Sequence, residues 1–180
     1  TLIQIPGDFM IRLGMGNPRH LLSFWEEIAE VMQSPKVFKF IHLPVQSGST
    51  DVLAEMKRKH SVKDYTYLVR KFREAIPNLT ISTDIIVGFP GETEADFAET
   101  LALAREVEFD NAYVFKYSPR RDTPAAAMEN QLPRELIEQR HAMVLAAIDE
   151  MGTRRYERFV GKTMEVLVEG PSRRNAARME

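Results

Sequence analysis

The chain has 180 residues, of which 44% are hydrophobic and 28% are charged, and its formal net charge at pH 7 is −2. It contains no cysteine, which excludes a disulfide framework, a thiolate metal site and any iron–sulfur cluster held by cysteines of this chain. No stretch approaches the roughly 18 consecutive apolar residues of a membrane span, and the first residues lack a signal-peptide pattern. We therefore expect a cytoplasmic protein with no membrane partner, and we interpret the chain, which does not begin with Met, as part of a longer one.

Four runs rich in β-branched and aromatic residues predict strands, and each is followed by Gly, Pro or Ser. They lie at Phe9–Leu13, Phe38–Leu43, Leu79–Val87 and Ala112–Tyr117. Apolar residues spaced by three and four predict helices between them. The first helix carries the apolar residues Trp25, Ile28 and Met32.

Two further helices begin at patterns typical of capping boxes. Ser61 and Asp64 open one of them, and Pro77 ends it. Thr93 and Asp96 open the other. The apolar residues expected to face the core are Val62, Tyr65, Val69, Phe72 and Ile76 in the first of these helices and Phe97, Leu101 and Ala104 in the second.

The alternation of strands and helices predicts an α/β fold with a parallel sheet and right-handed crossovers. Continuous apolar strands favour burial on both faces, so a (βα) barrel or a doubly wound sheet is favoured over a sandwich. In both architectures ligands bind at the C-terminal ends of the strands. The unusual polar residues of this sequence follow those strand ends.

The pattern changes after Pro133. A long helix follows, and its stripe consists of Leu136, Arg140, Val144, Ala147 and Met151. Alternating Met164, Val166 and Val168 then predict the first strand of a small all-β unit. We divide the chain into an α/β unit at 1–130, a connecting helix at 131–159 and the truncated start of a β unit at 160–180.

The C-terminal segment is basic although the whole chain is not. From Thr153 to Glu180 it has seven Arg or Lys and four Glu. A solvated helix end and a contact with RNA both explain this charge, and the charge alone favours the solvated helix end.

The first polar strand end is "HLPVQSGST", from His42 to Thr50. Most of it fits a capped turn in which Gly48 lets the backbone turn and Ser49 caps the next helix. That explanation does not need Gln46, whose amide can make two hydrogen bonds to a ribose or an amide. His42 is interpreted as a satisfied core residue, because the four His of the chain lack metal-ligand spacing.

The second strand end is "TDIIVGFPGET". Gly88 and Gly91 expose backbone that can approach a flat heterocycle or a phosphate. It is not a P-loop, because no Gly-Lys-Ser/Thr follows the glycines. Asp84 lies inside an apolar run, so it either faces a polar interior or holds a neighbour, and a purely structural carboxylate is the alternative.

The third strand end is "YSPRRDTPAAAM", where Tyr117 and Arg120 could stack on or clamp a ligand. Arg121 and Asp122 are given no role, because exposed charged residues in loops are usually only solvated.

Four ordered segments, "HLPVQSGS", "STDIIVGFPGET", "YSPRRDTPAA" and "VGKTMEVLVEGPS", resemble the C-terminal half of the radical S-adenosylmethionine (SAM) methylthiotransferases. The resemblance runs from about Met10 to the end. The segment "GKTMEVLVEGPSRRN" is most similar to the branch that methylthiolates isopentenyladenosine beside the tRNA anticodon. "RRD" after "YSP" departs from the Arg-Pro-Gly of the family.

This resemblance implies a partial (βα) barrel of parallel strands, a connecting helix and the first strand of TRAM, a small β-barrel that grips RNA. Members of the family hold two 4Fe–4S clusters through cysteines of an N-terminal domain and of a CxxxCxxC loop. Both segments would lie in a missing N-terminal part of the same polypeptide, and this chain would be inactive without them.

The resemblance also assigns residues to SAM. Gln46 and Ser47 would lie near the ribose, Lys57 or Arg58 would reach the methionine carboxylate, and backbone at 86–88 would border the adenine, with Tyr117 to Pro119 closing that side. The implied cofactor-binding residues are Gln46, Ser47, Lys57, Arg58, Asp84, Ile86, Val87, Gly88, Gly91, Tyr117, Ser118 and Pro119. No acid or base is assigned, because the cofactor performs the chemistry. The implied RNA-binding residues are Arg154, Arg155, Arg158, Lys162, Arg173 and Arg174.

Other functions stay open. A ribosomal protein or threonylcarbamoyladenosine in tRNA is the substrate in the other branches of the family. A non-catalytic βα scaffold and a nucleotide-binding enzyme on another (βα) barrel are the alternatives outside it. The sequence predicts no oligomeric state.

Overall fold

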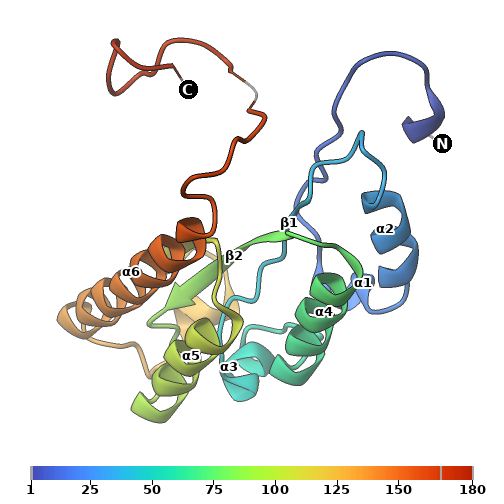
Figure 1. Ribbon diagram of the computed structural model, residues 1–180. Coiled ribbons are helices and arrows are strands. Elements are labelled where there is room, and N and C mark those ends of the chain that lie inside the picture. The colour runs from blue at the N-terminus through green and yellow to red at the C-terminus, as the bar shows by residue number, and fades with distance from the viewer. Residues whose placement is uncertain (1, 167, 180) are drawn as a thin grey trace.

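The computed structural model describes residues 2–166 and 168–179 and confirms the α/β class (Figure 1). A parallel sheet in the order β1-β2-β3 is formed by Phe40–His42, Thr80–Val87 and Asn111–Lys116. It is an open sheet and not a closed barrel. The helices are α1 (Pro18–Leu21), α2 (Trp25–Met32), α3 (Thr50–Glu55), α4 (Val62–Ala75), α5 (Glu94–Val107) and α6 (Arg134–Glu157), with 3₁₀ turns η1 (Leu2–Gln4) and η2 (Pro124–Ala127).

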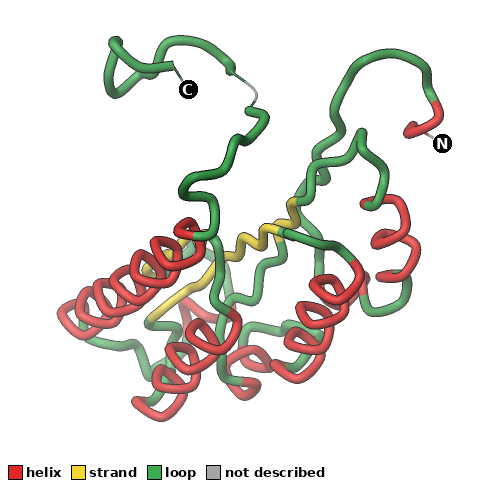
Figure 2. The backbone as a smooth tube through the Cα atoms, in the orientation of Figure 1, coloured by secondary structure: helices red, strands yellow, loops and turns green. Residues whose placement is uncertain are grey.

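The helices α4, α5 and α6 cover one face of the sheet, and the chain termini lie beyond the other face (Figures 1 and 2). Side chains alternate along β2, so Ile81, Ile85 and Val87 are buried, whereas Asp84 and Ile86 are partly exposed. We call the face that carries Asp84 and Ile86 the open face. The core between sheet and helices contains Ile41, Ile81, Ile85, Tyr65, Phe72, Phe97, Ala104 and Val144.

Both predicted capping boxes are present. The Ser61 hydroxyl accepts the Asp64 N–H, and Asp64 accepts the Ser61 N–H in return. Thr93 and Asp96 repeat the arrangement at α5. Such a cap stabilises a helix by about 1 kcal/mol. The predicted core positions of both helices are buried, except for Val62, which is partly buried.

The predicted strand at Phe9–Leu13 is wrong. In the described residues, this segment and the residues just after it run parallel to the residues before and within β1, but form isolated bridges only, Ile11 with Val37 and Met15 with His42. Four residue steps separate Ile11 from Met15, whereas five separate their partners, Val37 and His42. The extra residue interrupts the ladder as in a β-bulge.

Helix α6 lies along β3, where the His141 ring nitrogen Nε2 is 3.0 Å from the Val114 carbonyl oxygen. Four residues of its predicted stripe, Arg140, Val144, Ala147 and Met151, are buried, whereas Leu136 is only partly buried. No helix of the described residues is long and apolar enough to cross a membrane.

The predicted strand at Met164–Val168 does not form in the described part of this segment, and residue 167 lies outside it. The segment leaves α6 as an extended tail (Figure 1). Met164, Val166 and Val168 are exposed. A single strand needs a partner to hydrogen-bond its backbone, and no neighbouring strand pairs with the described residues here.

Candidate functional site

The C-terminal edge of the sheet brings residues of all three predicted strand ends together. Gln46 N–H donates to the Asp84 carbonyl at 2.8 Å, and Ile86 N–H donates to the Gln46 carbonyl at 2.9 Å. Tyr117 N–H donates to the Val87 carbonyl at 2.9 Å. Gln46 is buried and has φ +77°, a conformation that costs a non-glycine residue about 1 kcal/mol or more.

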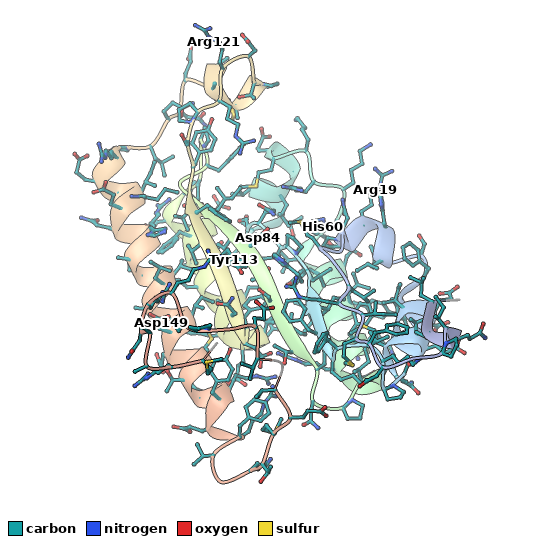
Figure 3. The ribbon with its side chains drawn as sticks, turned by 90° about the horizontal axis from the view of Figure 1, so that it is seen from above. Arg19, His60, Asp84, Tyr113, Arg121 and Asp149 are labelled. Carbon is teal, nitrogen blue, oxygen red and sulfur yellow. The ribbon has the colours of Figure 1, made fainter. Side chains whose placement is uncertain are left out.

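The open face carries a polar pair next to an aromatic ring. His42 Nε2 lies 2.8 Å from Asp84 Oδ1, and both side chains are at most 14% exposed. The ring of Tyr113, which pairs with Asp84 across the strands, lies 5.7 Å from the His42 ring. Figure 3 shows Asp84 and Tyr113 next to each other on this face. Asp84 therefore holds a neighbour, and His42 has the partner expected of a satisfied residue.

The turn after β1 is docked on α5. Ser47 is fully buried, and its hydroxyl accepts the Ser49 N–H at 3.1 Å and lies 3.4 Å from the Thr100 hydroxyl. Gly48 N–H donates to the Thr100 hydroxyl at 2.9 Å. Ser49 occupies the N-cap position of α3, but its hydroxyl donates to Asp96 instead of capping the helix. The structural turn thus accounts for Ser47.

The glycines of the second strand end also pack against protein. Gly88 has φ +77°, and a Cβ there would lie 2.5 Å from the side chain of Ile137 in α6. Gly91 has φ +83°, its N–H donates to the Asn130 carbonyl at 2.9 Å, and a Cβ would collide with the Asn130 side chain. The positive φ therefore favours glycine at both positions, and a side chain at Gly88 would also have to displace Ile137.

Sequence reasoning missed a buried ion pair at this loop. Arg140 of α6 lies 2.7 Å from Glu92, and the side chains are 4% and 1% exposed. Burial raises the pKa of Glu92, while hydrogen bonds from Arg140 and Gly88 oppose that rise. A cation inside an otherwise apolar helical stripe was the available signal, because a buried charge needs a partner.

The third strand end borders a groove of about 800 Å³ between β3 and the first half of α6. Tyr117, Ser118 and Pro119 line it, whereas Gln46 and Ile86 do not. The Tyr117 ring meets Phe89 edge-on at 5.4 Å. Its hydroxyl is buried without a hydrogen-bond partner in the described residues.

Lys57 and Arg58 lie exposed just after α3. Lys57 has φ +59°, its N–H donates to Ala54, and Arg58 N–H donates to Leu53, as in a Schellman cap. Both side chains therefore leave the helix end toward solvent.

The basic residues at the end of α6 are engaged by carboxylates of the chain. Arg155 and Arg158 donate to Asp110, whose side chain is fully buried. Arg154 pairs with Glu108 and Glu150. The exposed tail carries the other three predicted RNA-binding residues, Lys162, Arg173 and Arg174.

Comparisons with known proteins identify the family of this chain. The family model described as the radical SAM superfamily matches residues 5–104. A tRNA-2-methylthio-N(6)-dimethylallyladenosine synthase of Clostridium novyi is 43% identical over 98% of this chain and 38% of its own length. The protein of the same name from Bacillus subtilis is 46% identical over 96% of this chain and 33% of its length.

Among solved structures, coproporphyrinogen III oxidase (HemN) from Escherichia coli, described as a radical SAM enzyme, superposes with a TM-score of 0.64. The match covers 79% of this chain and 32% of that chain at 19% identity, which supports the fold alone. The chain spans between 33% and 38% of the length of the Bacillus and Clostridium relatives. Because the family model covers more than half of its residues, this chain belongs to the radical SAM superfamily.

Proposed function

We propose that this chain forms the later part of the radical SAM core of a tRNA methylthiotransferase that acts on isopentenyladenosine in the cytoplasm. The observation that carries the proposal is 43–46% identity, along nearly the whole chain, to relatives that are named for this modification. In this proposal residues 1–130 belong to the radical SAM unit, 131–159 connect it, and 160–180 begin a TRAM-like domain.

Groups at the C-terminal edge of the sheet support the binding of SAM there. Gln46 lies beside the backbone of Ile86, and the unpaired, buried hydroxyl of Tyr117 is a polar group that a ligand can satisfy. In this proposal Gln46, the backbone of 86–88 and Tyr117 bind the nucleoside part, and exposed Lys57 or Arg58 binds its carboxylate. When bound, SAM supplies the radical chemistry, and these residues orient it.

The 4Fe–4S clusters do not fit this chain alone, because cysteine thiolates ligate such clusters and the sequence has none. We therefore place both clusters on another part of the polypeptide. On that basis the 180-residue chain by itself does not cleave SAM.

For tRNA, the structure favours the tail over the helix. Arg154, Arg155 and Arg158 already pair with carboxylates, whereas Lys162 and Arg174 are exposed beyond α6. Cationic side chains in an extended segment can neutralise phosphates without breaking ion pairs of the fold.

An activity assay on the natural full-length protein tests this function. The protein is reconstituted anaerobically with iron and sulfide, supplied with SAM, a reductant and tRNA that carries isopentenyladenosine, and the digested tRNA is searched for the methylthio nucleoside. Its formation supports the proposal. Cleavage of SAM without modified tRNA contradicts the substrate, and a ribosomal protein and threonylcarbamoyladenosine tRNA are then tested. Failure to bind clusters would leave the scaffold as the better explanation.

A further inference from the structure

Two buried carboxylates connect α6 to opposite ends of β2. Asp110 accepts the Ile81 N–H at 2.8 Å and binds Arg155 of α6 and Arg158, the C-cap residue of that helix. Glu92 accepts the Gly88 N–H at 3.2 Å and binds Arg140 of the same helix. Seven residue steps of a strand separate Ile81 from Gly88, which is roughly 23 Å.

The Glu92 contact is enclosed by protein. Arg140 Nη1 lies 2.7 Å from the Glu92 carboxylate and donates to the Glu92 carbonyl at 3.0 Å. Arg140 Nη2 donates to Glu94 at 3.1 Å. The guanidinium also lies 5.1 Å from the centre of the Phe97 ring. Arg140 thus holds both the main chain and the side chain of Glu92.

The position of Gly88 depends on this carboxylate. Gly88 has φ +77° and no side chain that could fix it, so other backbone conformations are readily accessible to it. Glu92 limits them by accepting its N–H with both oxygens. A buried carboxylate keeps such a position only while its own partner stays in place.

We propose that Arg140 is a positioning residue that acts through Glu92 to fix the Gly88 backbone in the conformation that borders SAM. This inference rests on the proposed function for its ligand, whereas the dependence of Gly88 on Arg140 rests on the geometry alone. It gives the connecting helix a role in cofactor binding without any contact between Arg140 and the cofactor.

Hydrogen exchange tests the geometric step in the full-length protein without SAM. Arg140→Met and Glu92→Gln are expected to speed exchange of the 86–93 backbone about tenfold or more, because a hydrogen bond to a charged group is lost. Arg140→Lys keeps the charge without the planar fork and is expected to restore part of the protection.

Asp110→Asn is the matched control. It removes the charge of a buried carboxylate that likewise accepts a β2 N–H, that of Ile81, and binds Arg155 of α6. These contacts lie at the other end of the strand. Exchange is expected to rise near Ile81 and to stay unchanged at 86–93. Equal rises at 86–93 in the Asp110 and Glu92 variants would show a general loss of stability and overturn the proposal. Should Arg140→Met not fold, Arg140→Lys and Glu92→Gln test the proposal instead. Exchange at 86–93 is then expected to be faster in these two variants than in Asp110→Asn.

Equilibrium dialysis with labelled SAM on the cluster-loaded protein tests the second step. Arg140→Met is expected to weaken SAM binding about tenfold, Arg140→Lys less, and Asp110→Asn less than twofold. Unchanged SAM affinity in Arg140→Met would overturn the positioning role. If wild-type protein binds no SAM, the proposed function fails, and the exchange experiment still judges the link between Arg140 and Gly88.

Discussion

Gly48 is the residue at which the turn after β1 touches the backbone of α5. A Cβ at this position would lie 2.6 Å from the Glu99 carbonyl oxygen, and backbone cannot move aside as a flexible side chain can. We expect Gly48→Ala to lower the free energy of unfolding by about 1–3 kcal/mol through overpacking. Thermal unfolding of the full-length protein measures this change. The control is Gly14→Ala, since no atom lies within 4 Å of a Cβ there, and an equal loss in both variants would contradict the explanation.

Asp122 adopts φ +63° in the turn closed by the hydrogen bond from Thr123 N–H to the Arg120 carbonyl. This is one of the two positions at which the sequence departs from the Arg-Pro-Gly of the resembling family, and glycine is the residue that such a turn prefers. Melting temperatures are expected to rank Asp122→Gly above wild type and wild type above Asp122→Ala, with about 1 kcal/mol between glycine and alanine. An alanine variant as stable as glycine would show that the turn relaxes to another conformation.

The capping box of α4 makes the stability of an element depend on pH. Hydrogen bonds from the Ser61 backbone and side chain lower the pKa of Asp64. A carboxyl group with a lowered pKa stabilises the helix at pH values above its ordinary pKa, near 3.9. That contribution is lost as the pH falls through the lowered pKa. A peptide of residues 59–78 is therefore expected to lose helical circular dichroism below about pH 4. Asp64→Asn should remove most of this dependence and Glu74→Gln little of it, and the reverse order would refute the assignment.

The elements that could be predicted from the sequence are those with local signals. The capping boxes of α4 and α5 and the apolar run of β2 each carry their own pattern, and all three are confirmed. The run Phe9–Leu13 has the composition of a strand, but its pairing depends on the spacing of a distant segment, which composition does not encode.

In the candidate site, too, features with local signals could be predicted and contacts between distant residues could not. The position of Gln46, Ile86 and Tyr117 at one sheet edge follows from parallel topology, so it could be predicted. The partners of Asp84 and Arg140 could not be identified, because each contact joins residues more than 40 positions apart. The sequence required a partner for each charge without specifying which residue it is.

At the scale of the whole molecule, the open face leaves apolar surface in water. Tyr113 and Phe115 of β3 are about half exposed, and Met15 is 66% exposed. Among the described residues, the sheet edge at β1 is covered only by isolated bridges. We expect the 180-residue chain alone to associate or precipitate, as such surfaces and edges do. Light scattering after size exclusion measures this, and a monomer with a sharp, reversible melt would contradict it.

The position of α6 along β3 makes the two outer edges of the sheet different. At the outer edge of β3 the His141 ring of α6 lies beside the Val114 carbonyl, whereas the outer edge of β1 meets isolated bridges among the described residues. Strand order in space equals strand order in the chain. During synthesis β1, β2 and β3 would therefore emerge in the order in which they lie side by side, and α6, which follows β3 in the chain, would pack against it afterwards.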